Sequence, residues 1–309
     1  MGGMSGRDKT AWWAFAAAVV GVAAAMVAGA RGPGGELPAP PARPERIVCL
    51  TPSVTEAVFA LGAGDRVVGV TDFCTEPAAE GKVRLGGIFN PNFERLVSLR
   101  PDLVIVQGRA AQVAPFCREL RIPMVTVENH DVAGVLGDLR MLGEVLDCRE
   151  EATTLCGGIE AQLAAVRRAV KDRPKRRVFL SLYRTGGSLT SLTTATDGTY
   201  LGELIRLGGG ENVFGDLRQD YPQVSKEALL RRGVEVIIEP TGSGATSAEE
   251  EAQRRTDWRR LGPGSAVPAV ETGRIYFPRA DILLKPGPRL GEAARAMGEL
   301  IHPEAFDEP

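Results

Sequence analysis

Short apolar runs recur between residues 46 and 128, separated by segments whose apolar positions follow a helical spacing. The runs "RIVCL", "RVVGV", "RPDLVIVQ" and "IPMVTVE" predict buried strands. The segment "SVTEAVFALGAG" after the first run predicts a helix, because Ser53 and Glu56 are spaced as a capping box and glycines end the pattern. Strands that alternate with helices and lack hairpin turns predict a parallel sheet covered by helices.

The strand pattern disappears between residues 132 and 173 and then restarts. Residues 149–173 predict a helix of about 37 Å, at 1.5 Å per residue. Beyond it, "RRVFLSLY", "VEVIIE" and "RIYFP" predict strands, and "GPRLGEAARAMGELI" predicts a closing helix. The expected fold class is α/β, with two Rossmann-like lobes joined by a long rigid helix. Its parts are an N-terminal lobe at 46–131, a helical segment at 132–173 that includes the connecting helix, and a C-terminal lobe at 174–305.

The first 45 residues have a different composition. Arg7 and Lys9 precede an uncharged run at 11–30 that ends in Ala28-Gly29-Ala30, which is typical of an export signal with a cleavage site. A run of this length also suffices to cross a bilayer, so residues 1–30 are either a signal peptide or an uncleaved anchor. Residues 31–45 are rich in proline and glycine and predict a linker. In either case we expect the body of the protein in the periplasm or another extracytoplasmic space.

One short segment occurs in two versions. "NPNFERLVSL" at 90–99 and "YPQVSKEALL" at 221–230 both contain a proline loop, a cap-type residue and then a glutamate, Glu94 or Glu227. Each copy leads into a buried-type strand, which suggests two similar lobes. A carboxylate in the first turn of a helix gains about 0.3–1 kcal/mol from the helix dipole. Helix stabilisation is therefore one possible role of the two glutamates, and contact with a partner is another.

The composition narrows the class of function. A net charge of −2 argues against a nucleic-acid partner. The five cysteines form no C-x-x-C pair, and only His130 and His302 are available for a histidine-rich site, so we expect no intrinsic metal or cofactor. Phosphate-loop, G-x-S-x-G and H-E-x-x-H motifs are absent, which argues against an enzyme.

Several motifs in order carry a family resemblance: "RIVCLTPSVTEAVFALGAGDRVVGVTDFC", "NFERLVSLRPDLVIV", "GGENVF", "YPQVSKEALL" and "KPGPRL". With them the chain resembles the periplasmic substrate-binding proteins of ABC importers for cobalamin and ferric siderophores, the helical-backbone metal receptors. The resemblance implies a class III periplasmic binding protein that holds its ligand between two lobes. It also implies that Glu94 and Glu227 dock onto arginines of a permease dimer, which works with an ATPase.

Ligands of open α/β sheets bind beyond the carboxyl ends of the strands. Aromatic side chains there would stack on a flat macrocycle. Arg184 is expected either to meet an acidic group such as a haem propionate or to be a solvated loop arginine. Cys74 is expected either to ligate the metal of a chelate or to be a partly buried thiol. The candidate ligand-binding residues are Pro52, Ser53, Phe73, Cys74, Ile88, Phe89, Tyr183, Arg184 and Tyr221.

The chain departs from the cobalamin-binding members of this family. Ile88 and Tyr221 stand where those members have tryptophan, and Glu76 stands where they have tyrosine. We therefore expect a metal chelate as ligand, either a corrinoid such as cobalamin or chelated iron in a siderophore or haem. The membrane is reached through the permease or through an uncleaved anchor. A membrane-tethered sensor module, or an enzyme on the same fold, stays as an alternative.

Overall fold

The computed structural model describes residues 36–306, except 109–111, 185–188, 243–245 and 262–266. Among these residues the chain forms two compact units. The N-terminal unit contains the described residues up to Ile159 together with Pro286–Pro288, and the C-terminal unit contains Glu160–Lys285 and the described residues from Arg289 onward. The predicted signal or anchor at 1–30 lies outside the described residues.

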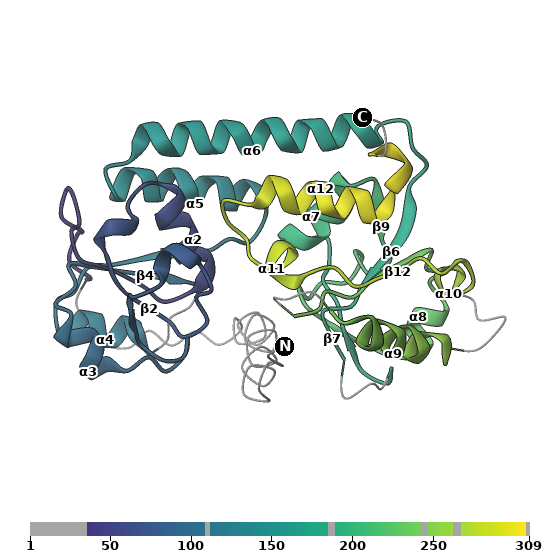
Figure 1. Cartoon of the computed structure of the whole chain (residues 1–309), viewed down its shortest axis with the longest axis horizontal. Coiled ribbons are helices and arrows are strands. Elements are labelled where there is room, and N and C mark those ends of the chain that lie inside the picture. Colours follow the sequence, from purple (N-terminus) through teal and green to yellow (C-terminus); the bar gives the residue numbers. More distant parts are fainter. Residues whose placement is uncertain (1–35, 109–111, 185–188, 243–245, 262–266, 307–309) are drawn as a thin grey trace. The chain divides into compact units, whose positions relative to one another are not determined.

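The N-terminal unit is built on a parallel sheet of five strands in the order β3-β2-β1-β4-β5 (Figure 1). The middle strands consist of buried apolar residues, because helices cover both faces of a parallel sheet. The strands are β1 (Ile47–Cys49), β2 (Val67–Val70), β3 (Val83–Arg84), β4 (Leu103–Gln107) and β5 (Met124–Val127). The helices of this unit are α2 (Pro52–Ala60), α3 (Phe93–Ser98), α4 (Val113–Glu119) and α5 (Val132–Val145), with 3₁₀ turns η2 (Gly64–Arg66) and η3 (Pro77–Ala79).

The C-terminal unit contains a parallel sheet in the order β12-β11-β6-β9. Its strands are β6 (Arg176–Leu180), β9 (Gly210–Asn212), β11 (Val236–Ile238) and β12 (Ile275–Tyr276). The unit also contains a small antiparallel sheet, which consists of β7 (Tyr183–Arg184), β8 (Leu192–Thr193) and β10 (Gln223–Val224). The helices are α7 (Tyr200–Leu207), α8 (Lys226–Leu230), α9 (Ala248–Arg259), α10 (Pro268–Thr272), α11 (Ala280–Leu283) and α12 (Leu290–Ile301), followed by η4 (Pro303–Ala305).

The two parallel sheets have the same topology. In chain order and in pairing, β1, β2, β4 and β5 correspond to β6, β9, β11 and β12. The expected α/β fold with two parallel sheets is therefore confirmed. The helix α6 (Arg149–Val170) has 22 residues and contributes to both units. No helix among the described residues has the length and hydropathy needed to cross a membrane.

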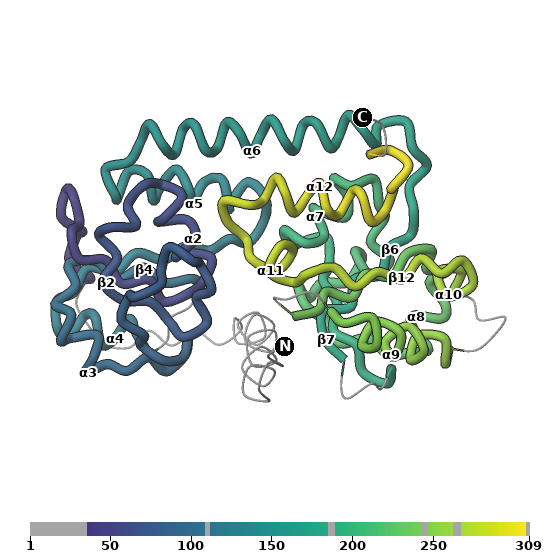
Figure 2. The backbone as a smooth tube through the Cα atoms, viewed as in Figure 1, coloured from purple at the N-terminus to yellow at the C-terminus, as the bar shows by residue number. Residues whose placement is uncertain are grey.

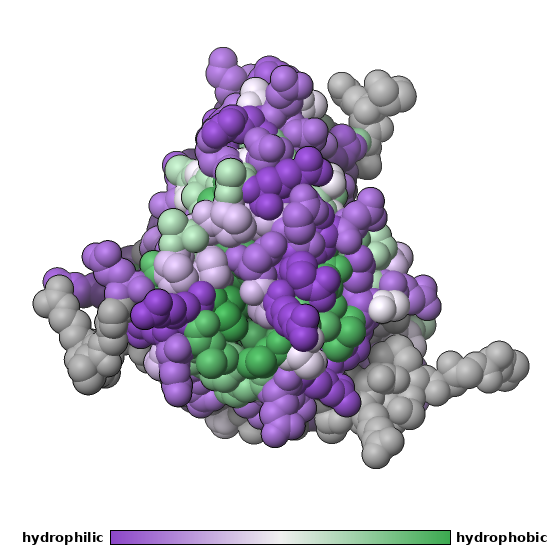
Figure 3. All heavy atoms as spheres, turned by 90° about the vertical axis from the view of Figure 1, so that its left-hand side faces the viewer, coloured by the Kyte–Doolittle hydropathy of each residue, from purple (hydrophilic) through white to green (hydrophobic). Residues whose placement is uncertain are grey.

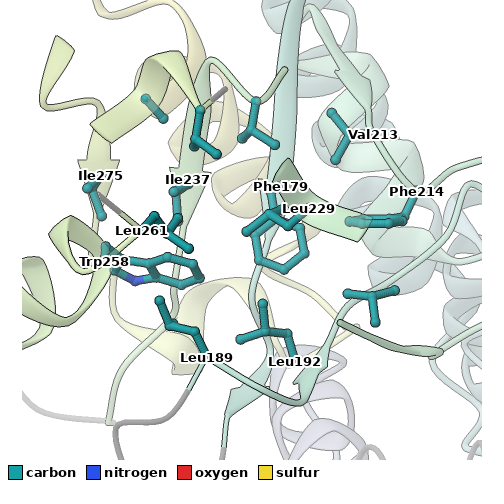
Figure 4. Packing of buried hydrophobic residues seen from close by; sticks show 14 residues of the cluster. Phe179, Leu189, Leu192, Val213, Phe214, Leu229, Ile237, Trp258, Leu261 and Ile275 are labelled. Carbon is teal, nitrogen blue, oxygen red and sulfur yellow. The ribbon is translucent and has the colours of Figure 1, made fainter. Parts of the chain in front are cut away.

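Two helices of the C-terminal unit, α7 and α12, pack side by side (Figure 2). Their close approach depends on Gly208, because a Cβ at this position would lie 3.0 Å from the backbone nitrogen of Gly298. The core cluster of this unit that contains β6, β11 and α9 residues is aromatic (Figure 4). There the rings of Phe179 and Trp258 lie edge to face with centroids 6.0 Å apart, and Phe214 packs on the other side of Phe179.

The structure corrects one local prediction. Ser53 was expected to cap its helix, but α2 begins at Pro52, and the N-cap residue Thr51 makes no side-chain cap bond. Proline is favoured at the first helical position, because a backbone N–H at this position has no acceptor within the helix and its absence in proline costs nothing. This places Ser53 in the first turn, where its hydroxyl is available for another contact.

The described part of the predicted linker, residues 36–45, lies on the N-terminal unit. Leu37 packs against the apolar core, and the carbonyl oxygen of Pro44 accepts a hydrogen bond from Arg66 at 2.9 Å. The backbone amides of Glu45 and Arg46 donate to the carboxylate of Asp102. This arm is therefore part of the folded unit.

Candidate functional site

The carboxyl ends of β1 and β4 are joined by a side-chain hydrogen bond. Ser53 donates its hydroxyl to Oε1 of Gln107 at 2.7 Å, and Pro52 beside it is buried. Ser53 itself is only 4% exposed. These residues lie at the carboxyl edge of the sheet in the N-terminal unit.

The loop after β2 carries Phe73 and Cys74. The guanidinium of Arg84 fixes the loop by donating to the carbonyl oxygens of Thr71 and Cys74 at 3.1 and 2.7 Å. The Cys74 thiol points inward, is 3% exposed and lies 3.0 Å from the hydroxyl of Thr55. This geometry favours the packed thiol over a metal ligand, and leaves the half-buried Phe73 as the side chain of this loop nearer to solvent.

A rim loop at residues 86–91 presents an exposed aromatic ring. Gly86 and Pro91 close the loop through an antiparallel bridge. Asp72 anchors it twice, since its amide donates to the carbonyl of Gly86 at 2.9 Å and its carboxylate accepts from the Gly86 amide at 3.0 Å. Ile88 is half-buried, whereas Phe89 at the tip is 47% exposed. The loop therefore holds Phe89 out on a fixed backbone.

In the C-terminal unit, the segment around Tyr221 is tied to the end of β8. The amide of Thr194 donates to the carbonyl of Pro222 at 3.1 Å, and the amide of Thr196 donates to that of Asp220 at 3.0 Å. Burial, followed by the nearby charge of Asp220, raises the pKa of Tyr221 well above its ordinary value, although a hydrogen bond with Thr199 opposes this shift. Tyr221 thus offers a neutral, half-buried phenol ring.

Arg184 belongs to a buried network of charges. Its guanidinium donates to Glu239 at 2.9 Å and to Asp257 at 3.0 Å, and the arginine is 7% exposed. Arg254 and the indole nitrogen of Trp258 also donate to Glu239, at 2.6 and 2.7 Å. The geometry favours a structural role for Arg184 rather than either role expected from the sequence. The neighbouring Tyr183 in β7 is half-buried.

The sequence did not predict two hydroxyl side chains that lie after strands of the C-terminal unit. Ser181 follows β6 and Thr194 follows β8, and both side chains are buried without a hydrogen-bond partner among the described residues. A buried hydroxyl without a partner is costly, so each is a candidate to pair with a polar group that enters this edge. The residue type alone gave no signal, because serine and threonine are common in loops.

Glu94 and Glu227 occupy the same position in two similar helix starts. Each is the second residue of its helix, α3 or α8, and each is exposed. The caps agree as well, since Asn92 accepts from the amide of Arg95 at 2.9 Å and Ser225 accepts from that of Ala228 at 3.2 Å. The repeat seen in the sequence is therefore a repeat in structure.

Neighbouring groups stabilise the ionised carboxylate of Glu227. The pKa of its carboxyl is lowered, first by its own backbone amide and then by the hydroxyl of Ser225. The positive charges of Lys226 and Arg231 add to this effect. Glu227 is thus held in its ionised form.

Metal-ligand chemistry is sparse in the part of the chain that the structure describes. No group of three or more His, Cys, Asp or Glu side chains is arranged there to hold a metal ion. The five cysteines are all buried, and none of them forms a disulfide in this structure. Burial, and after it the neighbouring Cys74, raise the pKa of Cys49 far above its ordinary value, so this thiol stays protonated.

Two α/β units of one topology, each with a fixed loop at its carboxyl edge and an exposed glutamate at a capped helix start, define a two-lobed solute-binding protein. The model of the periplasmic binding protein family matches residues 47–281. The chain therefore belongs to the periplasmic binding protein family. Members of this family bind solutes and are not enzymes, so the family match confirms both the expected resemblance and the expectation of a non-enzymatic protein.

Individual relatives agree with this assignment. YvrC of Bacillus subtilis, an uncharacterized ABC transporter substrate-binding lipoprotein, is 28% identical over 270 residues, which cover 86% of this chain and 82% of that protein. A vitamin B12-binding protein of Pectobacterium carotovorum is 27% identical over 259 residues, covering 82% of this chain and 87% of that protein. The fold is similar to that of the periplasmic heme-binding protein RhuT of Roseiflexus sp. RS-1, with a TM-score of 0.71, 24% identity and coverage of 84% and 99%.

Proposed function

We propose that this protein is the extracytoplasmic substrate-binding component of an ABC importer and that it delivers a metal chelate to a permease dimer with its ATPase. The observation that carries the proposal is the matched placement of Glu94 and Glu227. Both are exposed second residues of capped helices that lead into corresponding strands of two equivalent sheets. A single-lobed role would require only one such helix, whereas two permease subunits require two.

The proposed ligand is a flat or bulky chelate, either a corrinoid or chelated iron in a siderophore or haem. Phe89 on its rim loop and Tyr221 on its pinned segment offer aromatic faces, and Tyr183 and Phe73 add two half-buried rings. Such faces bury large areas at a small entropic cost. Relatives that bind vitamin B12 or heme support this class of ligand. Ile88, where cobalamin-binding members have an aromatic residue, keeps the choice between the chelates open.

Residues 1–30 are proposed to export the protein, and either to be removed or to stay as an anchor. The related YvrC is a lipoprotein. In this chain no cysteine stands at the end of the apolar run at 11–30, so a lipid anchor of that kind is not proposed.

The ligand is tested by purifying the protein from its native host and recording its absorption spectrum and the mass of any retained ligand. Titration with cyanocobalamin, haemin and a ferric siderophore then compares the three classes. Tight binding of one class supports the proposal. Failure of all three contradicts the assignment of a metal chelate.

Delivery is tested by charge reversal. Glu94→Lys combined with Glu227→Lys is expected to reduce uptake more than about 100-fold and to leave ligand affinity unchanged, because close like charges at an interface cost several kcal/mol. Glu80→Lys with Glu271→Lys is the matched control, since each unit then loses an exposed glutamate elsewhere. Normal uptake by the double variant would contradict docking through these residues, and normal ligand binding without any permease contact would favour a sensor.

A further inference from the structure

Two of the buried cysteines of the N-terminal unit lie next to one hydroxyl group. The thiol of Cys74 lies 3.0 Å from Oγ1 of Thr55 and 3.4 Å from Oγ1 of Thr71. Burial, and next the repulsion from Cys74, raise the pKa of Cys49, whereas a hydrogen bond with Thr55 opposes this shift. Both sulfur atoms are therefore neighbours of the Thr55 side chain.

The sheet brings these segments together. Cys49 is the last residue of β1, and its Cα is paired with that of Val70 at the end of β2. The chain then turns, because the amide of Cys74 donates to the carbonyl oxygen of Thr71 at 3.2 Å. Thr55 belongs to α2, the helix that directly follows β1. Two cysteines that are distant in the sequence are thus brought to the same end of one sheet.

The other three cysteines have different surroundings. Cys117 belongs to the apolar cluster that contains Val48, the neighbour of Cys49 in β1. Successive residues of a strand point to opposite faces, so Cys117 and Cys49 lie on opposite faces of the sheet. Cys148 and Cys156 are eight positions apart, which is about 12 Å along α6, whereas a disulfide requires Cα atoms within about 4.4–6.8 Å. Neither of these pairings fits a disulfide.

We propose that Cys49 and Cys74 become joined by a disulfide bond in the exported protein and that this bond fixes the loop that carries Phe73. The inference rests on the proposed function, because an extracytoplasmic location provides the oxidising environment. The bond links the loop after β2 covalently to β1, in addition to the hydrogen bonds that Arg84 donates to this loop. Phe73, a candidate ligand-binding residue, is then held on a cross-linked backbone.

The oxidant is the disulfide of an extracytoplasmic thiol-disulfide oxidoreductase. One cysteine loses its proton and attacks this disulfide, which forms a mixed disulfide and releases one sulfur of the oxidant as a thiolate. The second cysteine loses its proton and attacks the sulfur of the first. The new S–S bond forms, and the other sulfur of the oxidant leaves. The oxidant thus accepts two electrons, takes up the two protons and becomes a dithiol.

Burial determines when the bond forms. Cys49 is 0% exposed and Cys74 is 3% exposed. Figure 3 shows one face of the N-terminal unit, where hydrophilic residues cover most of the surface and apolar residues gather in its lower part. An oxidoreductase cannot reach a sulfur atom beneath such a surface, and attack requires a thiolate, which the raised pKa of Cys49 disfavours. We therefore expect the bond to form while the chain folds, before the two sulfur atoms are enclosed.

The test compares the protein exported by its own N-terminal segment with the protein kept in the cytoplasm of the same host by deletion of residues 1–30. Each sample is unfolded in urea with excess N-ethylmaleimide and without reductant, and the labels are counted by mass spectrometry. The chain has five cysteines, so the exported protein is expected to carry three labels and the cytoplasmic protein five. Peptide mapping of the exported protein should give one cross-linked pair of peptides, which contains Cys49 and Cys74.

Two variants serve as controls. Cys148→Ser with Cys156→Ser removes two other buried thiols, so the exported variant should keep the bond and carry one label. Cys49→Ser should carry four labels, because Cys74 then has no partner for the bond. Five labels on the exported wild type, or a bond between other cysteines, overturns the proposal.

The proposed function can fail separately. If cell fractionation finds no export of the wild type, the extracytoplasmic role is contradicted. Refolding of the reduced protein in a glutathione redox buffer then decides on the pairing. A bond between Cys49 and Cys74 alone supports the proposal, and any other result overturns it.

Discussion

The N-terminal and C-terminal units build a glutamate-bearing helix in the same way and surround it differently. In both helices, the N-cap side chain accepts a hydrogen bond from the backbone amide three residues later. The strand that follows the helix, β4 or β11, pairs with the first strand of its own sheet, β1 or β6. In α3, Glu94 is followed by the exposed Arg95 and Val97, whereas the charges of Lys226 and Arg231 act on Glu227 in α8. The shared backbone sets where the two carboxylates lie, and their surroundings determine which forces act on them.

The carboxyl edges of the two sheets show a second contrast. At the N-terminal edge, the ends of β1 and β4 are joined by the neutral bond between Ser53 and Gln107. At the C-terminal edge, the end of β11 is held through Glu239 by buried charges that include Arg184. Removal of one partner of a buried ion pair leaves an uncompensated charge, so the two edges should respond very differently to mutation.

The largest expected effect is at Arg184. Arg184→Ala should lower the free energy of unfolding of the C-terminal unit by about 3–5 kcal/mol, because Glu239 and Asp257 lose a buried cation. Gln107→Ala in the N-terminal unit should cost only about 1–3 kcal/mol, since it leaves the neutral hydroxyl of Ser53 with the hydroxyl of Thr51 at 3.4 Å in place of the acceptor at 2.7 Å. In a chain that starts at residue 31, Trp258 is the sole tryptophan, so its fluorescence during urea unfolding reports on this network.

Arg206→Ala provides the control for Arg184→Ala. The side chain of Arg206 is 65% exposed and pairs with Glu203 on the same helix, so its loss should cost about 1 kcal/mol or less. A loss of the same small size in Arg184→Ala would contradict the structural role of Arg184. It would return Arg184 to the set of ligand-binding candidates.

The repeat around Glu94 and Glu227 could be predicted from the sequence, because cap, acid and apolar strand are all local signals. The charge network could not, since it joins Arg184, Glu239 and Asp257 from separate elements. The two-residue strands β7, β8 and β10 are too short to show a period of two. The helix α9 lacks an apolar stripe and has one buried apolar residue, Trp258.

The candidate ligand residues were predicted from the rule that ligands of open α/β sheets bind beyond the carboxyl ends of the strands. That rule selects loops and does not say which side chains of a loop face the ligand. It selected Phe89, which is exposed, and Cys74, which is buried, without a distinction between them. Inward or outward orientation in a loop follows from contacts such as those of Arg84 with the carbonyl oxygens of Thr71 and Cys74. Such contacts depend on the folded backbone and leave no periodic pattern in the sequence.

The next largest effect concerns the aromatic residues that the two units offer to a ligand. Phe89→Ala and Tyr221→Ala should each lower affinity about tenfold, or about 1.4 kcal/mol, as the loss of a stacked ring does. Tyr221→Phe should retain affinity, because its hydroxyl is already engaged with Thr199. Titration of each variant with haemin and cyanocobalamin provides the measurement. An effect confined to one unit would show that only that unit contacts the ligand.

A smaller effect tests whether the two helix starts are equivalent. Asn92→Ala and Ser225→Ala should each cost about 1 kcal/mol, because each removes the acceptor for one helical amide. Hydrogen exchange of the amides of Arg95 and Ala228 measures the loss locally. Glycine at either cap should cost only a few tenths of a kcal/mol. Unequal losses of stability in the two variants would show that the two helix starts already differ in their backbone capping, apart from any difference in the surroundings of the glutamates.

The smallest effect concerns the ionisation of Glu227. Folding lowers the pKa of this carboxyl, so the stabilising interaction is present above the ordinary pKa of about 4.3 and is lost as the pH falls through the lowered value. The hydroxyl of Ser225 is the second largest cause, so Ser225→Ala should move the NMR titration midpoint of Glu227 upward. Asp216, whose pKa is lowered by Arg232, serves as the internal control and should not move. An unchanged midpoint for Glu227 would show that Ser225 caps the helix without tuning the carboxylate that is proposed to meet the permease.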